Sequence, residues 1–119
     1  MDDKTLGRLG ETLAAQYLTA QGYRLVYRNF RTALGEIDLI AHEDDTIVFV
    51  EVKTRLSARH GRPSEAVSYH KQRKIIRMAH VYLSRINGWH QPCRFDVIEI
   101  LWHETNPVLN HIRHAFVVS

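Results

Sequence analysis

Cysteine is almost absent from this sequence, and long apolar runs are absent altogether. The one cysteine among the 119 residues is Cys93, so no disulfide can form within the chain and a reducing compartment is expected. No apolar run approaches the roughly 20 residues that a membrane-spanning helix needs. After Met1 the chain continues Asp-Asp-Lys, without the pattern of a secretory leader. We therefore expect a cytoplasmic protein that does not enter a membrane.

The sequence also lacks the motifs of several enzyme classes. It has no glycine-rich phosphate loop, and no serine or cysteine with the partners of a catalytic triad. No cysteine cluster accompanies the eight histidines, which counts against structural zinc. His111 and His114 lie three apart on an expected strand and should point to opposite faces of it.

Basic residues are concentrated in one part of the chain. From Lys53 to Arg77 there are eight lysines and arginines and a single acid, Glu65, which gives a local charge of +7. The remainder has eight basic and twelve acidic residues, a charge of −4. Such a basic region is expected where a nucleic acid binds. A solvated helix face with an arginine-rich loop gives the same pattern, and charge alone does not separate the two interpretations.

The apolar pattern predicts one domain spanning residues 1–119, with two helices and five strands. The helices are expected at 4–21 and in a long segment that ends near Gly88. Alternation predicts strands at 23–30, 36–42, 46–54, 94–102 and 112–118, and a polar loop at 56–64. The short acidic turn after 36–42 predicts an antiparallel hairpin. Strand 46–54 is apolar on both faces and should be central. The order α-β-β-β-α-β-β predicts an α/β fold, a mixed sheet flanked by helices.

Charged residues interrupt the two strands that should be most buried. Because residues two apart on a strand point the same way, Glu51 and Lys53 share one face. Glu36 and Asp38 likewise share a face, with the apolar side chains opposite, namely Ile37, Leu39 and Ala41. Burying acids and a lysine is unfavourable unless they pair or bind a metal, so a functional site is expected here.

Glu11 is a further candidate, from the first helix. It lies on the flank of the apolar stripe, where small neighbours leave it room to reach the sheet. Alone, it would more readily be interpreted as a half-exposed helix residue. Together with Asp38 and Glu51 it suggests a site for Mg²⁺ or Mn²⁺, because such ions prefer carboxylate oxygens. Lys53 could hold an attacking water and offset charge in the transition state.

Two segments carry a family resemblance: Gly35-Glu-Ile-Asp-Leu-Ile-Ala41 and Phe49-Val-Glu-Val-Lys-Thr-Arg55. They resemble the signature of the bacterial YraN-type proteins, an endonuclease-like branch of the PD-(D/E)xK superfamily. Shorter matches support it: Gly10-Glu11, Arg28-Asn29, Lys71-Gln72 and Arg94-Phe95-Asp96. The archaeal Holliday-junction resolvases have a similar order of a helix Glu, a strand Asp and Glu-x-Lys. Ile37 stands where the superfamily name has proline.

The resemblance implies a restriction-endonuclease-like core and metal-dependent hydrolysis of DNA, including branched DNA, by a homodimer. It implies that Glu11, Asp38, Glu51 and Lys53 are catalytic. It also implies that the metal is held by Asp38, Glu51, Glu11 and the backbone carbonyl of Val52.

Further residues have two interpretations each. Lys71 and Gln72 fall toward the buried side of the second helix and could lie over the metal site, or Lys71 could extend past the helix end. Glu36 could support the metal site or pair with an arginine. Asp96 is expected to pair with a buried arginine. The expected phosphate contacts are Arg55, Lys71, Gln72, Arg73, Lys74 and Arg77.

Three functions remain open from the sequence. The first is a metal-dependent nuclease, which the three acids and Lys53 favour. The second is a nucleic-acid-binding module of the same fold with little or no turnover. The third is a protein-interaction module, against which the +7 segment counts.

Overall fold

The structure, a computed structural model, describes residues 2–56, 67–103 and 106–117. Its elements are α1 (Asp3–Ala20), β1 (Arg24–Thr32), β2 (Gly35–Glu43), β3 (Thr46–Arg55), α2 (Tyr69–Ile86), β4 (Cys93–His103) and β5 (Asn106–Phe116). This confirms the predicted order α-β-β-β-α-β-β. The predicted loop at 56–64 lies outside the described residues except for Leu56, which is exposed. None of the described helices is long and apolar enough to cross a membrane.

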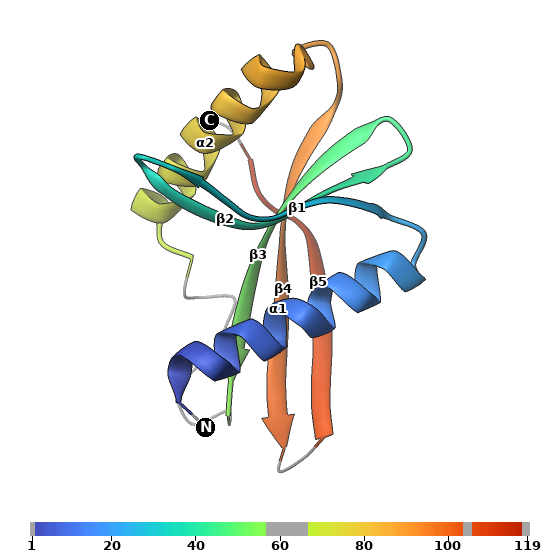
Figure 1. Cartoon of the computed structure of the whole chain (residues 1–119), viewed down its shortest axis with the longest axis vertical. Coiled ribbons are helices and arrows are strands. Elements are labelled where there is room, and N and C mark those ends of the chain that lie inside the picture. The colour runs from blue at the N-terminus through green and yellow to red at the C-terminus, as the bar shows by residue number, and fades with distance from the viewer. Residues whose placement is uncertain (1, 57–66, 104–105, 118–119) are drawn as a thin grey trace.

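The five strands form one mixed sheet in the order β1-β2-β3-β4-β5 (Figure 1). The predicted hairpin of β2 and β3 is antiparallel, and β3 is the central strand, as expected. The pairing of β3 with β4 is parallel. A parallel neighbour requires a crossover, and α2 lies within the crossover here.

Each face of the sheet has its own apolar cluster. On one face, Leu18 of α1 packs with Val48 and Val50 of β3. On the other face, Met78 and Tyr82 of α2 pack in a cluster with Phe49 of β3. Successive residues of β3 therefore supply opposite clusters, which explains why its sequence is apolar without alternation.

One predicted face assignment on β2 is wrong. Ile37 was expected on the same face as Leu39 and Ala41, but it packs in the α2-side cluster while they pack in the α1-side cluster. The regular pairing of β2 with β3 ends at Leu39, opposite Val50. Beyond it, the Asp38 side chain accepts a hydrogen bond from the backbone of β3. The change of face therefore coincides with the end of the pairing to β3, while the pairing to β1 continues with Ile37 opposite Phe30.

The last strand begins earlier than predicted, at Asn106 rather than near residue 112. β5 is an edge strand, and most of its first half is exposed. An edge strand needs no apolar alternation and tolerates proline, here Pro107, so its first half resembles a loop in sequence.

Candidate metal centre

Three carboxylates from two elements meet at one end of the sheet. One oxygen of Glu11 on α1 lies within 4.8 Å of oxygens of Glu36 and Asp38 on β2, which also lie within that distance of each other. Gly10 allows α1 to approach β3, because a Cβ there would overlap the Thr54 hydroxyl and lie 3.0 Å from the Thr54 Cβ. The structure thus brings together two predicted ligands, Glu11 and Asp38, with Glu36.

Asp38 occupies the point where β2 and β3 separate. Its Oδ2 accepts a hydrogen bond of 2.7 Å from the backbone N–H of Val52. Burial and the neighbouring Glu51 carboxylate raise the pKa of Asp38 to about 8. A carboxyl group with so high a pKa is unfavourable in its charged form, unless a cation compensates it.

Glu51, on β3, lies beside Asp38 and is 6% exposed. Its Oε1 lies 2.5 Å from Lys71 Nζ and 3.6 Å from Lys53 Nζ. Within the described residues its buried Oε2 has no hydrogen-bond partner. Burial and a hydrogen bond with Lys71 lower the pKa of Lys53. Two lysines thus lie beside one buried carboxylate, so of the two interpretations of Lys71 the structure shows the one that places it over the acids.

Asn29 orients the third carboxylate, a role that sequence reasoning missed. Its Nδ2 donates a hydrogen bond of 3.1 Å to Glu11 Oε1. Asn29 has a φ of 57°, a left-handed conformation that asparagine adopts more readily than most residues. Burial and Glu36 raise the pKa of Glu11. The only sequence signal for Asn29 was its place in the Arg28-Asn29 match.

Both predicted roles of Glu36, support of the metal site and pairing with an arginine, fit its contacts. It lies in the acid cluster, and its Oε2 pairs with Arg31 Nε at 2.8 Å. Val52 contributes its backbone N–H to Asp38, and its side chain packs against the α1-side cluster.

Of the six predicted phosphate contacts, Lys71 and Lys74 lie near the carboxylates. Lys71 contacts Glu51, which lies beside the acid cluster of Glu11, Glu36 and Asp38. Lys74 and Lys71 together line a cavity. Gln72 instead donates to the carbonyl of Val67, two residues before α2 begins. Arg73 and Arg77 are exposed on α2, and Arg73 contacts the ring and hydroxyl of Tyr69. Arg55 is half-buried at the end of β3.

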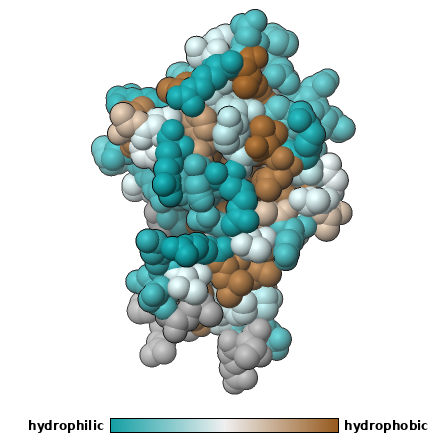
Figure 2. Space-filling view, viewed as in Figure 1, coloured by the Kyte–Doolittle hydropathy of each residue, from teal (hydrophilic) through white to brown (hydrophobic). Residues whose placement is uncertain are grey.

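Two hollows flank the acid cluster and share Glu36. The first, of about 520 Å³, lies between α1 and the β1–β2 hairpin. The second, of about 330 Å³, lies between that hairpin and α2. In Figure 2, hydrophilic side chains gather between the hairpin and the first half of α1. Glu36 is therefore accessible from both hollows, and Glu11 from the first.

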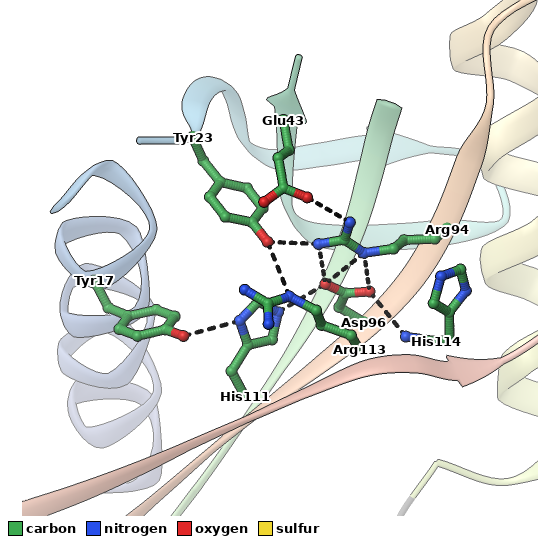
Figure 3. Close-up of polar contacts among 8 residues, drawn as sticks. All are labelled: Tyr17, Tyr23, Glu43, Arg94, Asp96, His111, Arg113 and His114. Carbon is green, nitrogen blue, oxygen red and sulfur yellow. Dashed lines mark hydrogen bonds and ion pairs between the residues drawn. The ribbon is translucent and has the colours of Figure 1, made fainter. Parts of the chain in front are cut away.

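A second polar cluster surrounds Arg94 and Asp96 at the start of β4, and its members bind one another (Figure 3). The buried guanidinium of Arg94 contacts Asp96 at 3.0 Å and Glu43 at 2.7 Å. This confirms that Asp96 pairs with a buried arginine. Asp96 also contacts His111 Nε2 at 2.7 Å, and His111 Nδ1 contacts the Tyr17 hydroxyl. Every member is bonded to another, as buried polar groups require.

His114 joins this cluster through its backbone, which leaves the predicted opposition of the His111 and His114 side chains a prediction. The ring of His111 and the backbone N–H of His114 both reach Asp96. The pairing of β4 with β5 shifts register between Phe95 and Val97, and His114 has a φ of 51°. This bulge brings the backbone N–H of His114 within reach of the Asp96 carboxylate.

The acid cluster has the donor set of a hard divalent cation. Carboxylate oxygens are the ligands that Mg²⁺ and Mn²⁺ prefer. Glu51 Oε2, without a hydrogen-bond partner in the described part of the chain, is an additional buried donor beside Asp38. Glu11, Asp38 and Glu51 could therefore hold a metal, with Glu36 as a further carboxylate.

Comparison with known proteins identifies the family. Residues 10–100 match the family described as "Uncharacterised protein family UPF0102". A UPF0102 protein of Caldanaerobacter subterraneus subsp. tengcongensis is 48% identical over 98% of both chains. One of Alkaliphilus oremlandii is 51% identical over 96% of this chain and 99% of its own. One of Symbiobacterium thermophilum is 52% identical over 82% of each. The chain therefore belongs to the UPF0102 family, the YraN-type proteins.

Proposed function

We propose that this protein is a Mg²⁺- or Mn²⁺-dependent endonuclease that hydrolyses phosphodiester bonds of DNA. Its mixed sheet with a helix on each face would then be the restriction-endonuclease-like core of the PD-(D/E)xK superfamily. The observation that carries the proposal is the buried pair of Asp38 and Glu51. Burial, together with the repulsion from Glu51, raises the pKa of Asp38 to about 8, an arrangement that weakens a fold and suits cation binding.

The chain's residues divide the work of such a reaction. Asp38, Glu51 and Glu11 would hold the ion, and Asn29 fixes Glu11 through its hydrogen bond. When bound, the ion would supply charge neutralisation at the phosphate and a water of lowered pKa. Lys53, which lies beside Glu51, would orient the attacking water, and its lowered pKa would ease loss of a proton. Lys71 is placed to offset charge on the phosphate.

The contact of Lys71 with Glu51 favours a second candidate function. An ammonium 2.5 Å from Glu51 Oε1 already compensates that carboxylate. If Lys71 remained there, the cluster would bind metal weakly, and the protein would be a nucleic-acid-binding module with little turnover.

Cleavage of labelled DNA tests the first function against the second. Linear, flapped and four-way DNA would be incubated with Mg²⁺ or Mn²⁺ and either wild type or the Asp38→Asn variant. We expect metal-dependent cleavage by wild type, and at least a hundredfold slower cleavage by the variant with DNA binding retained. The control is Asp45→Asn, at an exposed hairpin turn outside the cluster, which should cleave like wild type. DNA binding without cleavage of any substrate would favour the binding module.

A further inference from the structure

The hollow between α1 and the β1–β2 hairpin carries basic residues that lie outside the +7 segment. We call it the arginine cleft. Its basic residues are Lys4, Arg8, Arg28 and Arg31, and all four are exposed. Lys4 and Arg8 come from α1, whereas Arg28 and Arg31 come from β1. Residues distant in the sequence therefore bring four cations to one cleft, which is also lined by the acids Asp3, Glu11 and Glu36.

The arginine cleft opens directly onto the acid cluster. Glu11 and Glu36 line the cleft, and both belong to the cluster with Asp38. A ligand in the cleft would therefore lie next to the phosphodiester group at the acid cluster.

In the part of the chain that the structure describes, two of the arginines form no ion pair with these acids, although the charge of Arg28 partly offsets the rise in the pKa of Glu11. Arg31 pairs with Glu36. Within the described residues, neither Arg8 nor Arg28 lies within 4.0 Å of a carboxylate. The Arg28 guanidinium is instead held by the Thr12 hydroxyl at 3.1 Å. A guanidinium has five N–H donors, so Arg28 is positioned with donors left for a phosphate.

Cations also lie on the opposite side of Glu36. The second hollow is lined by Lys71 and Lys74 of α2, together with Glu36. The acid cluster is thus flanked by lysines on one side and by the arginine cleft on the other. A strand with a phosphate at the acids would extend its neighbouring phosphates to both sides.

We propose that the arginine cleft binds the sugar-phosphate backbone of one nucleic-acid strand, next to the bond at the acid cluster. Arg8 and Arg28 contact successive phosphates, and the strand continues past Glu36 to Lys71 and Lys74. The cleft, of about 520 Å³, is in the size range of small-ligand pockets, so one sugar-phosphate backbone can enter it. The proposal rests on the proposed function, since it concerns the substrate of the same site.

Salt-dependent binding tests the cleft separately from catalysis. All proteins would carry Asp38→Asn to prevent cleavage, and binding of a fluorescent 12-nucleotide single strand would be followed by anisotropy over a range of salt. Each lost phosphate contact reduces the slope of log affinity against log salt by about 0.7 on a single strand. For Arg8→Gln/Arg28→Gln we expect a slope shallower by about 1.4 and an affinity at least tenfold lower at low salt.

A matched control removes the same charge elsewhere. Arg24→Gln/Arg85→Gln also removes two arginines, one on β1 and one on α2, and neither lines the arginine cleft. It should lower the slope much less than the cleft variant. Arg8→Gln alone, at an exposed helix position, should lose about half of the slope change and guards against misfolding of the double variant.

The outcomes separate the two proposals. An unchanged slope in the cleft variant, with the parent binding DNA, would overturn the arginine cleft and leave the proposed function intact. Equal losses in the cleft variant and its control would also overturn it. A parent that binds neither single-stranded nor duplex DNA would overturn the proposed function itself.

Discussion

The Asp38 carboxyl group opposes folding when it is charged. Burial and Glu51 raise its pKa to about 8, against about 3.9 for an unfolded aspartate. The folded protein therefore binds this proton more tightly than the unfolded chain does. The resulting stability is present at low pH and is lost as pH rises from about 4 to about 8.

From this we expect Asp38→Asn to stabilise the metal-free protein at pH 7. The asparagine carbonyl can still accept the Val52 hydrogen bond, whereas the charge is gone. The gain should be on the order of 1–3 kcal/mol, raise the melting temperature by several degrees and shrink toward pH 4. Thermal melting in chelator from pH 4 to 8 measures it. An exposed control, Asp45→Asn, should show no such gain. A variant no more stable than wild type at pH 7 would contradict the strain at Asp38.

Asp96 differs from Asp38 in that folding lowers its pKa. Burial alone would raise its pKa, but hydrogen bonds from His111 and Arg94 outweigh burial and keep the pKa below the usual range. Its folded pKa is depressed, so its contribution to stability is present above the unfolded pKa of about 3.9 and is lost as pH falls below it.

Asp96→Asn should therefore be strongly destabilising. It leaves the buried Arg94 guanidinium without the fully buried one of its two carboxylate partners, a change that costs about 3 kcal/mol or more. Tyr17→Phe removes a single hydrogen bond to His111 and should cost only about 1 kcal/mol. Urea unfolding at pH 7 measures both free energies. Equal, small losses would mean that the Arg94 cluster does not anchor the start of β4.

At the scale of elements, the packing of α1 on β3 sets the position of Glu11. The contact occurs at Gly10, where a methyl group would overlap Thr54. At Gly7 on the same helix, a methyl group would meet nothing within 4 Å. The two glycines therefore form a matched pair.

We expect Gly10→Ala to destabilise the fold by about 1–3 kcal/mol, since α1 must shift away from β3. Gly7→Ala should instead stabilise it by up to about 1 kcal/mol through helix propensity. Unfolding in urea compares the two, and metal affinity reports on Glu11. If Gly10→Ala gained stability like Gly7→Ala, the close approach of α1 to β3 would be refuted.

Sequence patterns predicted the elements whose periodicity is regular. β3 is apolar on both faces, so its central position followed, and the acids that interrupt it and β2 marked the site. The face of Ile37 and the contacts of His114 could not be predicted. Both lie where the pairing with one neighbouring strand ends or shifts register, and that depends on the neighbouring strand.

The role of Asn29 was hidden for a similar reason. Its effect depends on a left-handed backbone and on a helix residue 18 positions away. The arginine cleft likewise joins α1 and β1 residues that form no cluster in the sequence. Local charge density revealed the +7 segment but not this second basic surface.

At the scale of the whole molecule, the two apolar clusters hold the fold while the acid cluster weakens it. Each face of the sheet is packed by one helix, and the carboxylates gather where β2 and β3 separate between them. A stable sheet would have apolar residues there. A bound cation would remove the repulsion, so stability and metal binding should be linked.

The most direct test of the central claim is a calorimetric titration of Mn²⁺ into wild type and the Asp38→Ala/Glu51→Ala variant. A matched control, Asp44→Ala/Asp45→Ala, removes two carboxylates from the exposed hairpin turn. We expect saturable binding to wild type and to the control, and none to the cluster variant. Binding that survives in the cluster variant, or that is absent from wild type even with DNA present, would contradict a metal centre at Asp38 and Glu51.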